Sequence, residues 1–150
     1  ASGEVTMPTQ PAFLVATSST QANIAANNSA VVVLFATERF DQNADFNVSD
    51  YTFTAPVTGK YMLSCDLFMT GVDTAATYYA AQIKTSNREF ENIQAGSFFG
   101  ASDPNYASMA WSVLADMDAN DTAFVQIYQH SGTAQTDILT NSWFSGYLAC

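Results

Sequence analysis

The chain has 150 residues, the length of one domain with a full hydrophobic core, and its 14 Asp and Glu residues against 4 Lys and Arg give a net charge of -10. This acidic balance repels phosphate backbones and anionic membrane surfaces, so it argues against a nucleic-acid partner and leaves cations and neutral sugars as ligand classes. The longest apolar run, residues 30–36, is far shorter than the ~20 residues that span a bilayer, so no membrane insertion is expected.

The N-terminal third predicts an extended segment and two strands separated by loops. Pro8 and Pro11 disfavour a helix, so we interpret residues 1–10 as an extended lead-in to a single domain over residues 11–150. The elements expected next are a short strand (12–17), a loop (18–29), a buried strand with a β-branched run (30–37) and an acidic, Asn-rich winding connection (38–50).

Residues 51–69, YTFTAPVTGKYMLSCDLFM, carry the strongest structural signal in the chain. Two runs of β-forming residues flank a corner at Pro56 and Gly59, where Pro fixes its own φ and Gly allows a sharp turn. After the corner, two-residue alternation predicts a strand whose core-facing side consists of Tyr61, Leu63, Cys65, Leu67 and Met69. The other side carries Met62 and Phe68, which are large apolar groups where such a strand ordinarily meets water. This second side predicts a subunit contact.

Short strands recur through the rest of the sequence. They are expected at residues 78–85, 89–94, 107–115, 123–130 and 138–150, with two longer loops at 95–105 and 131–137. No segment shows a sustained helical period, and a strand spacing of about ten residues is typical of an antiparallel sandwich or barrel. The fold class is therefore all-β.

Few residues point to chemistry. Asp116, Asp118 and Asp121 are close enough in sequence to share a hard cation such as calcium, but they lack the Gly and the distal Glu of a calcium loop, so a solvated turn is the alternative. His130 is the only histidine and no motif frames a nucleophile, so we expect no catalytic residue, no metal centre and no cofactor. Cys65 sits in mid-strand and Cys150 ends the chain, so free thiols are expected.

Three segments resemble the globular head domain family of complement component 1q. YTFTAPVTGKY (51–61) resembles the family's aromatic strand with an Ala-Pro-Val turn, Gly and Tyr. NDTAFVQI (120–127) is similar to its Gly-Asp-x-Val strand start, with Asn120 in place of the glycine and Ala123 in place of the valine. SWFSGYL (142–148) is similar to the run that closes the domain. The order and spacing also match, so the resemblance covers residues 11–150.

The resemblance implies a ten-stranded antiparallel jelly-roll sandwich, shared with tumour necrosis factor, that assembles as a homotrimer. It implies that Met62 and Phe68 lie at the trimer interface, and that Cys150 lies near Gly59 and Tyr61, too far from Cys65 for a disulfide. Some relatives bind calcium, but residues 78–84 offer no carboxylate, so calcium at that site is not expected. The composition looks more microbial or viral than vertebrate.

The resemblance leaves two functions open. The first is a trimeric adhesion head outside cells, displayed on a fibre or virion and binding a cell-surface protein or glycan through loops. The residues predicted to line those loops are Phe98, Phe99, Asp103, Tyr106, His130 and Thr133. The alternative is a structural protein that decorates or cements a capsid or coat by contacting virion shell proteins.

Overall fold

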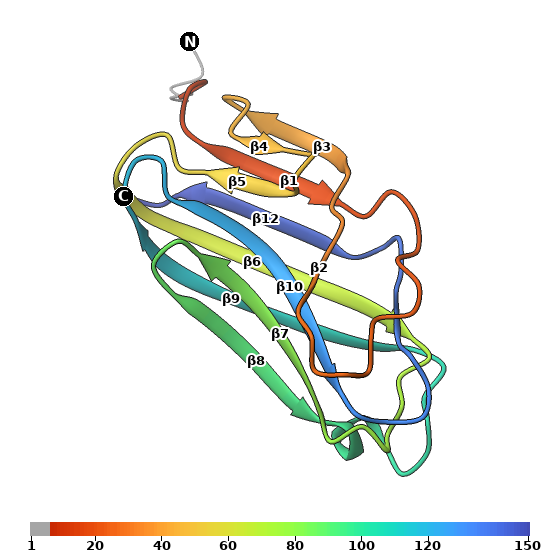
Figure 1. The fold of residues 1–150 in the computed structure, drawn as a ribbon. Coiled ribbons are helices and arrows are strands. Elements are labelled where there is room, and N and C mark those ends of the chain that lie inside the picture. Colours follow the sequence, from red (N-terminus) through yellow and green to blue (C-terminus); the bar gives the residue numbers. More distant parts are fainter. Residues whose placement is uncertain (1–6) are drawn as a thin grey trace.

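Two antiparallel sheets pack face to face in the computed structural model, which describes residues 7–150 (Figure 1). Sheet A contains β1 (Ala12–Ala16), β3 (Thr37–Gln42), β6 (Gly59–Thr70), β9 (Ala107–Met117), β11 (Asp137–Ile138) and β12 (Trp143–Leu148). Sheet B contains β2 (Val31–Val32), β4 (Phe46–Asn47), β5 (Thr52–Thr54), β7 (Tyr78–Thr85), β8 (Glu89–Ala95) and β10 (Thr122–His130). One short 3₁₀ helix, η1 (Gly96–Phe99), follows β8. The all-β prediction is confirmed, although the strands number twelve in the described residues because three are only two residues long.

Strand β6 has the two faces that its sequence predicts. Its alternate residues, Tyr61 to Met69, are almost fully buried against sheet B, whereas Met62 and Phe68 face outward and are half-buried. The corner before β6 needs its glycine, because a Cβ on Gly59 would lie 2.6 Å from Leu148 Cδ1 and 2.8 Å from the Cys150 carbonyl oxygen. The Tyr61 hydroxyl donates to the Val57 carbonyl at 2.7 Å, which holds the corner against the strand.

Aromatic side chains from both sheets fill the core. Phe13 lies on β1 in sheet A, and its ring stacks on Phe53 of β5 in sheet B at 4.7 Å between centroids. Phe144 meets Phe13 edge to face at 5.1 Å, and Phe46 packs beside both. Each such buried side chain contributes roughly 1.5–3 kcal/mol, so this cluster joins the two layers.

Two strand predictions are wrong in their bounds. Residues 30–37 do not form one buried strand, since they contain only β2 and the first residue of β3, and Leu34 is 39% exposed, although Val33 and Phe35 are buried. The predicted connection at 38–50 instead contains most of β3 and all of β4. β3 is an edge strand of polar sequence whose pairing with β1 shifts register between Leu14 and Val15, so it carries no clean alternation.

The predicted closing strand at 138–150 is also interrupted. The chain leaves β11, turns at residues 139–142 and re-enters sheet A as β12. Ser142 fixes this turn, since its backbone N–H donates to the Leu139 carbonyl at 3.1 Å and its hydroxyl accepts from the Phe68 N–H at 2.9 Å.

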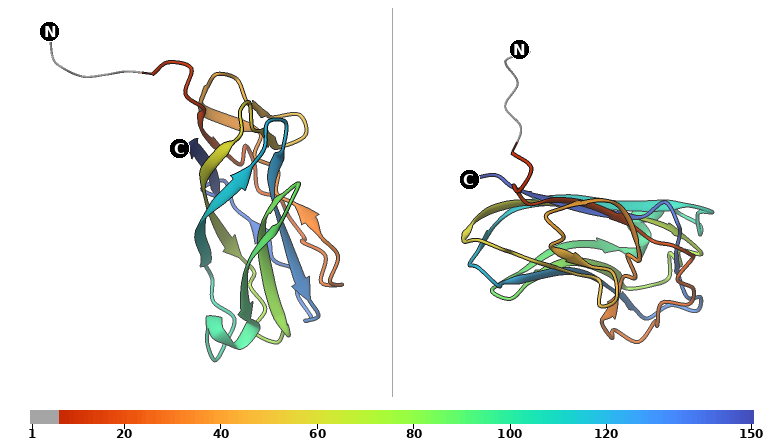
Figure 2. Two further views of the ribbon diagram at one scale, coloured as in Figure 1. Left: turned by 90° about the vertical axis from the view of Figure 1, so that its left-hand side faces the viewer. Right: turned by 90° about the horizontal axis from the view of Figure 1, so that it is seen from above.

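The first described residues, 7–10, and Cys150 lie at the same end of the sandwich (Figures 1 and 2). The predicted lead-in at 1–10 falls partly on residues 1–6, outside the described residues, and residues 7–10 form a turn with the Gln10 N–H donating to the Met7 carbonyl. Cys150 lies beside the start of β6, with its carbonyl accepting from the Lys60 N–H at 2.7 Å. Both cysteines are free, as predicted. No helix within residues 7–150 is long and apolar enough to cross a membrane.

Candidate functional site

The outward face of sheet A presents apolar side chains in a row across its strands. The register places Leu114 of β9 and Tyr147 of β12 on either side of Met62 of β6. Leu114 is 53% exposed and Tyr147 49% exposed, so this row meets solvent in the isolated chain. The next row is small and polar, with Ser112, Ser64 and Ser145 side by side. The sequence indicated only Met62 and Phe68, since Leu114 and Tyr147 join the row through strand register, which the sequence does not show directly.

A carboxyl group lies on this same face. Asp66 stands between Ala110 and Trp143, and its Oδ1 atom is buried without a hydrogen-bond partner among residues 7–150. Burial raises the pKa of Asp66, and a hydrogen bond with Ser108 partly offsets that rise. Phe68 continues the face beyond Asp66, and its ring stacks on Tyr106 at 5.4 Å between centroids. Tyr106, predicted to line a binding loop, therefore extends the outward face of sheet A.

The loops that hold Phe98, Phe99, Asp103 and Thr133 lie at the end of the sandwich opposite Cys150 (Figure 1). Within η1, Phe98 is 68% exposed, while Phe99 packs edge to face on Tyr79 at 5.5 Å. Phe98 is therefore free to contact a partner and Phe99 anchors the loop. Asp103 is exposed and accepts from both the N–H and the hydroxyl of Thr74 at 2.8 and 2.7 Å.

The loop between β10 and β11 is held rigidly. Asp73, which is 2% exposed, accepts backbone N–H bonds from Ala75, Thr133 and Ala134. Those donors, led by Ala134, lower the pKa of Asp73. Gln129 adds a second clamp, accepting from the Thr136 N–H at 3.0 Å and donating to the Ala134 carbonyl at 2.6 Å. Thr133 is thus part of this scaffold, and Asp73 is a residue that sequence analysis did not single out.

His130 ends β10 and packs against a tyrosine. Its ring stacks on Tyr78 at 4.9 Å between centroids, and its Nδ1 is buried without a hydrogen-bond partner among residues 7–150. The Tyr78 hydroxyl donates to Asn28 Oδ1 at 2.8 Å. His130 therefore belongs to the outward surface of sheet B rather than to the loop end.

The three aspartates proposed as a cation site lie at the opposite end of the sandwich and serve other partners. Asp116 pairs with Arg88 at 3.2 Å, which lowers the pKa of Asp116. Asp121 caps the turn between β9 and β10 by accepting from the Asp118 N–H at 2.8 Å. Within residues 7–150, no three His, Cys, Asp or Glu side chains are arranged to hold a metal ion.

These observations define a class of protein: a two-sheet jelly-roll sandwich with one apolar outward face and a loop end held by buried hydrogen bonds. The model of one family, the C1q domain, matches residues 12–149, and the chain belongs to that family. The resemblance seen in the sequence is therefore confirmed. The family's domains are non-catalytic, which also confirms that the chain is not an enzyme.

Solved structures agree on the fold. The globular domain of zebrafish complement 1qA protein matches with a TM-score of 0.65 at 15% identity, covering 94% of this chain and 98% of that chain. A crystal structure of murine APRIL matches with a TM-score of 0.63 at 12% identity, covering 93% and 98%. No curated protein matches this sequence. Domains of the C1q and tumour necrosis factor type generally trimerise, and these matches give no support to the viral or microbial origin suggested by composition.

Proposed function

We propose that this chain is the head of a homotrimer that recognises a cell-surface protein or glycan outside cells. The apolar row of Leu114, Met62 and Tyr147 carries the proposal. An antiparallel sheet normally turns polar residues to water, and contiguous apolar groups on a surface mark a contact. The family generally trimerises, so a second and third copy of the chain are the partners of this face.

The position of the loops supports recognition. With the outward face of sheet A occupied by neighbouring subunits, the loop end stays accessible, and it lies away from Cys150 (Figure 2). The clamps on Asp73 and Gln129 restrict the loops before a partner arrives, which reduces the conformational entropy lost on binding. Phe98 then offers an exposed aromatic contact on a fixed support.

Assembly is tested by sedimentation of the wild type and of Phe68→Asp. We expect a trimer at micromolar concentration for the wild type. Phe68→Asp should be monomeric, because assembly would bury three unpaired carboxylates. The matched control is Ile93→Asp, which puts the same charge at a 53% exposed apolar position on the outward surface of sheet B and should stay trimeric. A monomeric wild type would contradict the proposal.

Recognition is tested with the isolated trimer on cells and on a glycan array. Binding to either, weakened by Phe98→Ala, is the expected result. If the trimer binds neither cells nor the glycan array and instead binds and stabilises an assembled capsid or coat, the alternative role as a decoration protein is correct. We favour recognition because the similar structures named above come from zebrafish and mouse proteins, and display on a fibre or virion is not needed to explain the surfaces.

A further inference from the structure

The outward face of sheet B contains a hollow one side chain deep. Ala80 stands at its floor, since β7 lies between β8 and β10 and the register places Ile93 and Tyr128 on either side of it. Tyr78 and Gln82 occupy the outward positions before and after Ala80 along β7. The depression has a volume of about 570 Å³ and is lined by Asn28, Tyr78, Gln82, Glu91, Ile93 and Tyr128. We call this feature the Ala80 hollow.

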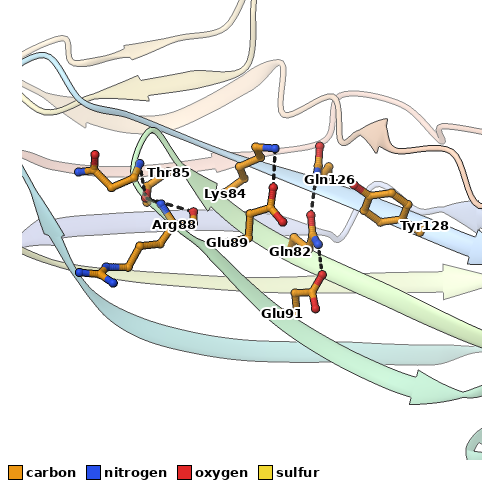
Figure 3. Close-up of polar contacts among 9 residues, drawn as sticks. Gln82, Lys84, Thr85, Arg88, Glu89, Glu91, Gln126 and Tyr128 are labelled. Carbon is orange, nitrogen blue, oxygen red and sulfur yellow. Dashed lines mark hydrogen bonds and ion pairs between the residues drawn. The ribbon is translucent and has the colours of Figure 1, made fainter.

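A row of hydrogen-bonded polar side chains runs along one side of the Ala80 hollow, and two of its members, Gln82 and Glu91, line the hollow. Gln126 donates to Gln82, and Gln82 donates to Glu91, so the row crosses β10, β7 and β8 in turn (Figure 3). The two glutamines are only 3% and 5% exposed although they lie on the outer side of the sheet. The row is therefore fixed before any ligand arrives. Amide and carboxylate groups offer donors and acceptors side by side.

Aromatic and aliphatic groups complete the hollow, and their positions are fixed too. The Tyr128 hydroxyl accepts from Gln126 Nε2 at 2.9 Å, so the ring leans along β10 toward the polar row. Tyr78 is held by its bond to Asn28 and by stacking on His130. Ile93 is 53% exposed and adds an apolar edge on the β8 side.

We propose that the Ala80 hollow binds a neutral pyranose sugar. The C–H groups of a sugar ring pack on aromatic and aliphatic surface, while its hydroxyls exchange hydrogen bonds with amides and carboxylates, and both kinds of group line this depression. Charge selects against the other ligand classes. Two carboxylates line the hollow: Glu89 is paired with Lys84 at 2.6 Å, and the charge of Glu91 disfavours anions. Within residues 7–150, Glu91 is not joined by two further His, Cys, Asp or Glu side chains in an arrangement that could hold a metal ion.

The hollow remains open in the assembly proposed above. It lies on the outward face of sheet B, whereas assembly uses the outward face of sheet A on the other side of the sandwich (Figure 2). The inference rests on the proposed recognition role and assigns part of that role to a sheet surface rather than to the loop end. It also commits to glycan rather than protein as the ligand of this surface.

The test uses saturation-transfer NMR on the full chain with the methyl glycosides of glucose, galactose, mannose and N-acetylglucosamine. We expect saturation transfer from the wild type to at least one glycoside. Ala80→Leu fills the hollow from its floor and should weaken binding at least tenfold. Ile93→Ser removes an exposed apolar edge without touching the core, so it should fold and still weaken binding even if Ala80→Leu does not fold. Val57→Ser, at a 46% exposed position in the corner before β6, is the matched control and should bind as the wild type does.

Three results would overturn the inference. One is no transfer from the wild type to any of the four glycosides. Another is transfer that survives both Ala80→Leu and Ile93→Ser, or that is lost in Val57→Ser. The third is binding of tetramethylammonium that disappears in Glu91→Gln while no glycoside binds, since this would identify a cation site. A wild type that binds cells but none of these sugars would reject the Ala80 hollow and leave the proposed recognition role standing.

Discussion

Asp73→Asn should destabilise the chain strongly, because a buried carboxylate there accepts three backbone N–H groups from two loops. The amide keeps the size of the side chain but replaces one oxygen with a donor. In one orientation the new NH₂ group faces the Ala75 N–H, and in the other it faces the N–H groups of Thr133 and Ala134, so two donors point at each other in either case. A buried donor left without a partner costs about 1–3 kcal/mol, and the remaining bonds lose their charge assistance, so we expect a total of about 2–4 kcal/mol. For a chain of this length, that lowers Tm by roughly 5–15 °C.

The assay is thermal and urea unfolding at a fixed protein concentration, repeated from pH 7 down to pH 2. The pKa of Asp73 is lowered in the folded state, so its stabilisation is fully present above the unfolded pKa of about 3.9 and is lost as pH falls through the folded pKa. The difference between wild type and Asp73→Asn should therefore be largest near neutrality and shrink in acid. Asp103→Asn is the control, because Asp103 is exposed and serves only Thr74. Equal stability at pH 7, or a difference that persists unchanged at pH 2, would refute the reasoning.

Three smaller predictions concern sheet A and the surface. In urea titrations, Asp66→Asn should be more stable than the wild type at pH 7 but not at pH 3. The pKa of Asp66 is raised in the folded state, so its ionisation at pH 7 destabilises the wild type, whereas at pH 3 the carboxyl is protonated. No gain in stability at pH 7 would contradict this prediction. Gly146→Ala should cost about 1–3 kcal/mol, read from the urea midpoint against Ser145→Ala, because the new Cβ would lie 2.6 Å from Leu63 Cδ2. Arg88→Ala should leave the urea midpoint close to that of the wild type, since its ion pair is exposed, and a clear fall in the midpoint would show that Arg88 has a structural role.

The sequence sufficed to predict elements in which one side of a strand is buried. β6 is such a case, since its inward residues alternate strictly and its outward residues Met62 and Phe68 already look unsuited to water. β3 could not be predicted in the same way. It lies at the edge of sheet A with sequence TERFDQ, and half of its residues are exposed, so burial imposes no pattern on it. The break before β12 depends on Ser142 reaching the backbone of β6, which is a tertiary contact.

The functional surfaces were less predictable than the core, and for a different reason. Phe98 could be proposed as a contact from the sequence because it is an aromatic residue in a predicted loop, and its side chain is 68% exposed. The Ala80 hollow could not, because its walls come from β7, β8 and β10, and its depth comes from a small residue between larger ones on neighbouring strands. The sequence does show that Tyr78, Ala80 and Gln82 alternate along β7 and therefore lie on one face of that strand. It does not show which residues of the neighbouring strands lie beside them.

The same two-residue period gives the two sheets opposite roles. In β6 the outward positions include Met62 and Phe68, so burying them in an assembly releases apolar surface from water. In β7 the outward positions include Gln82 and Lys84, whose hydrogen bonds would have to be broken or matched before another subunit could cover them. Hydrophobic association therefore favours sheet A over sheet B as the face for the proposed assembly. Because the two faces share no side chains, Phe68→Asp and Ala80→Leu should act independently on assembly and on sugar binding.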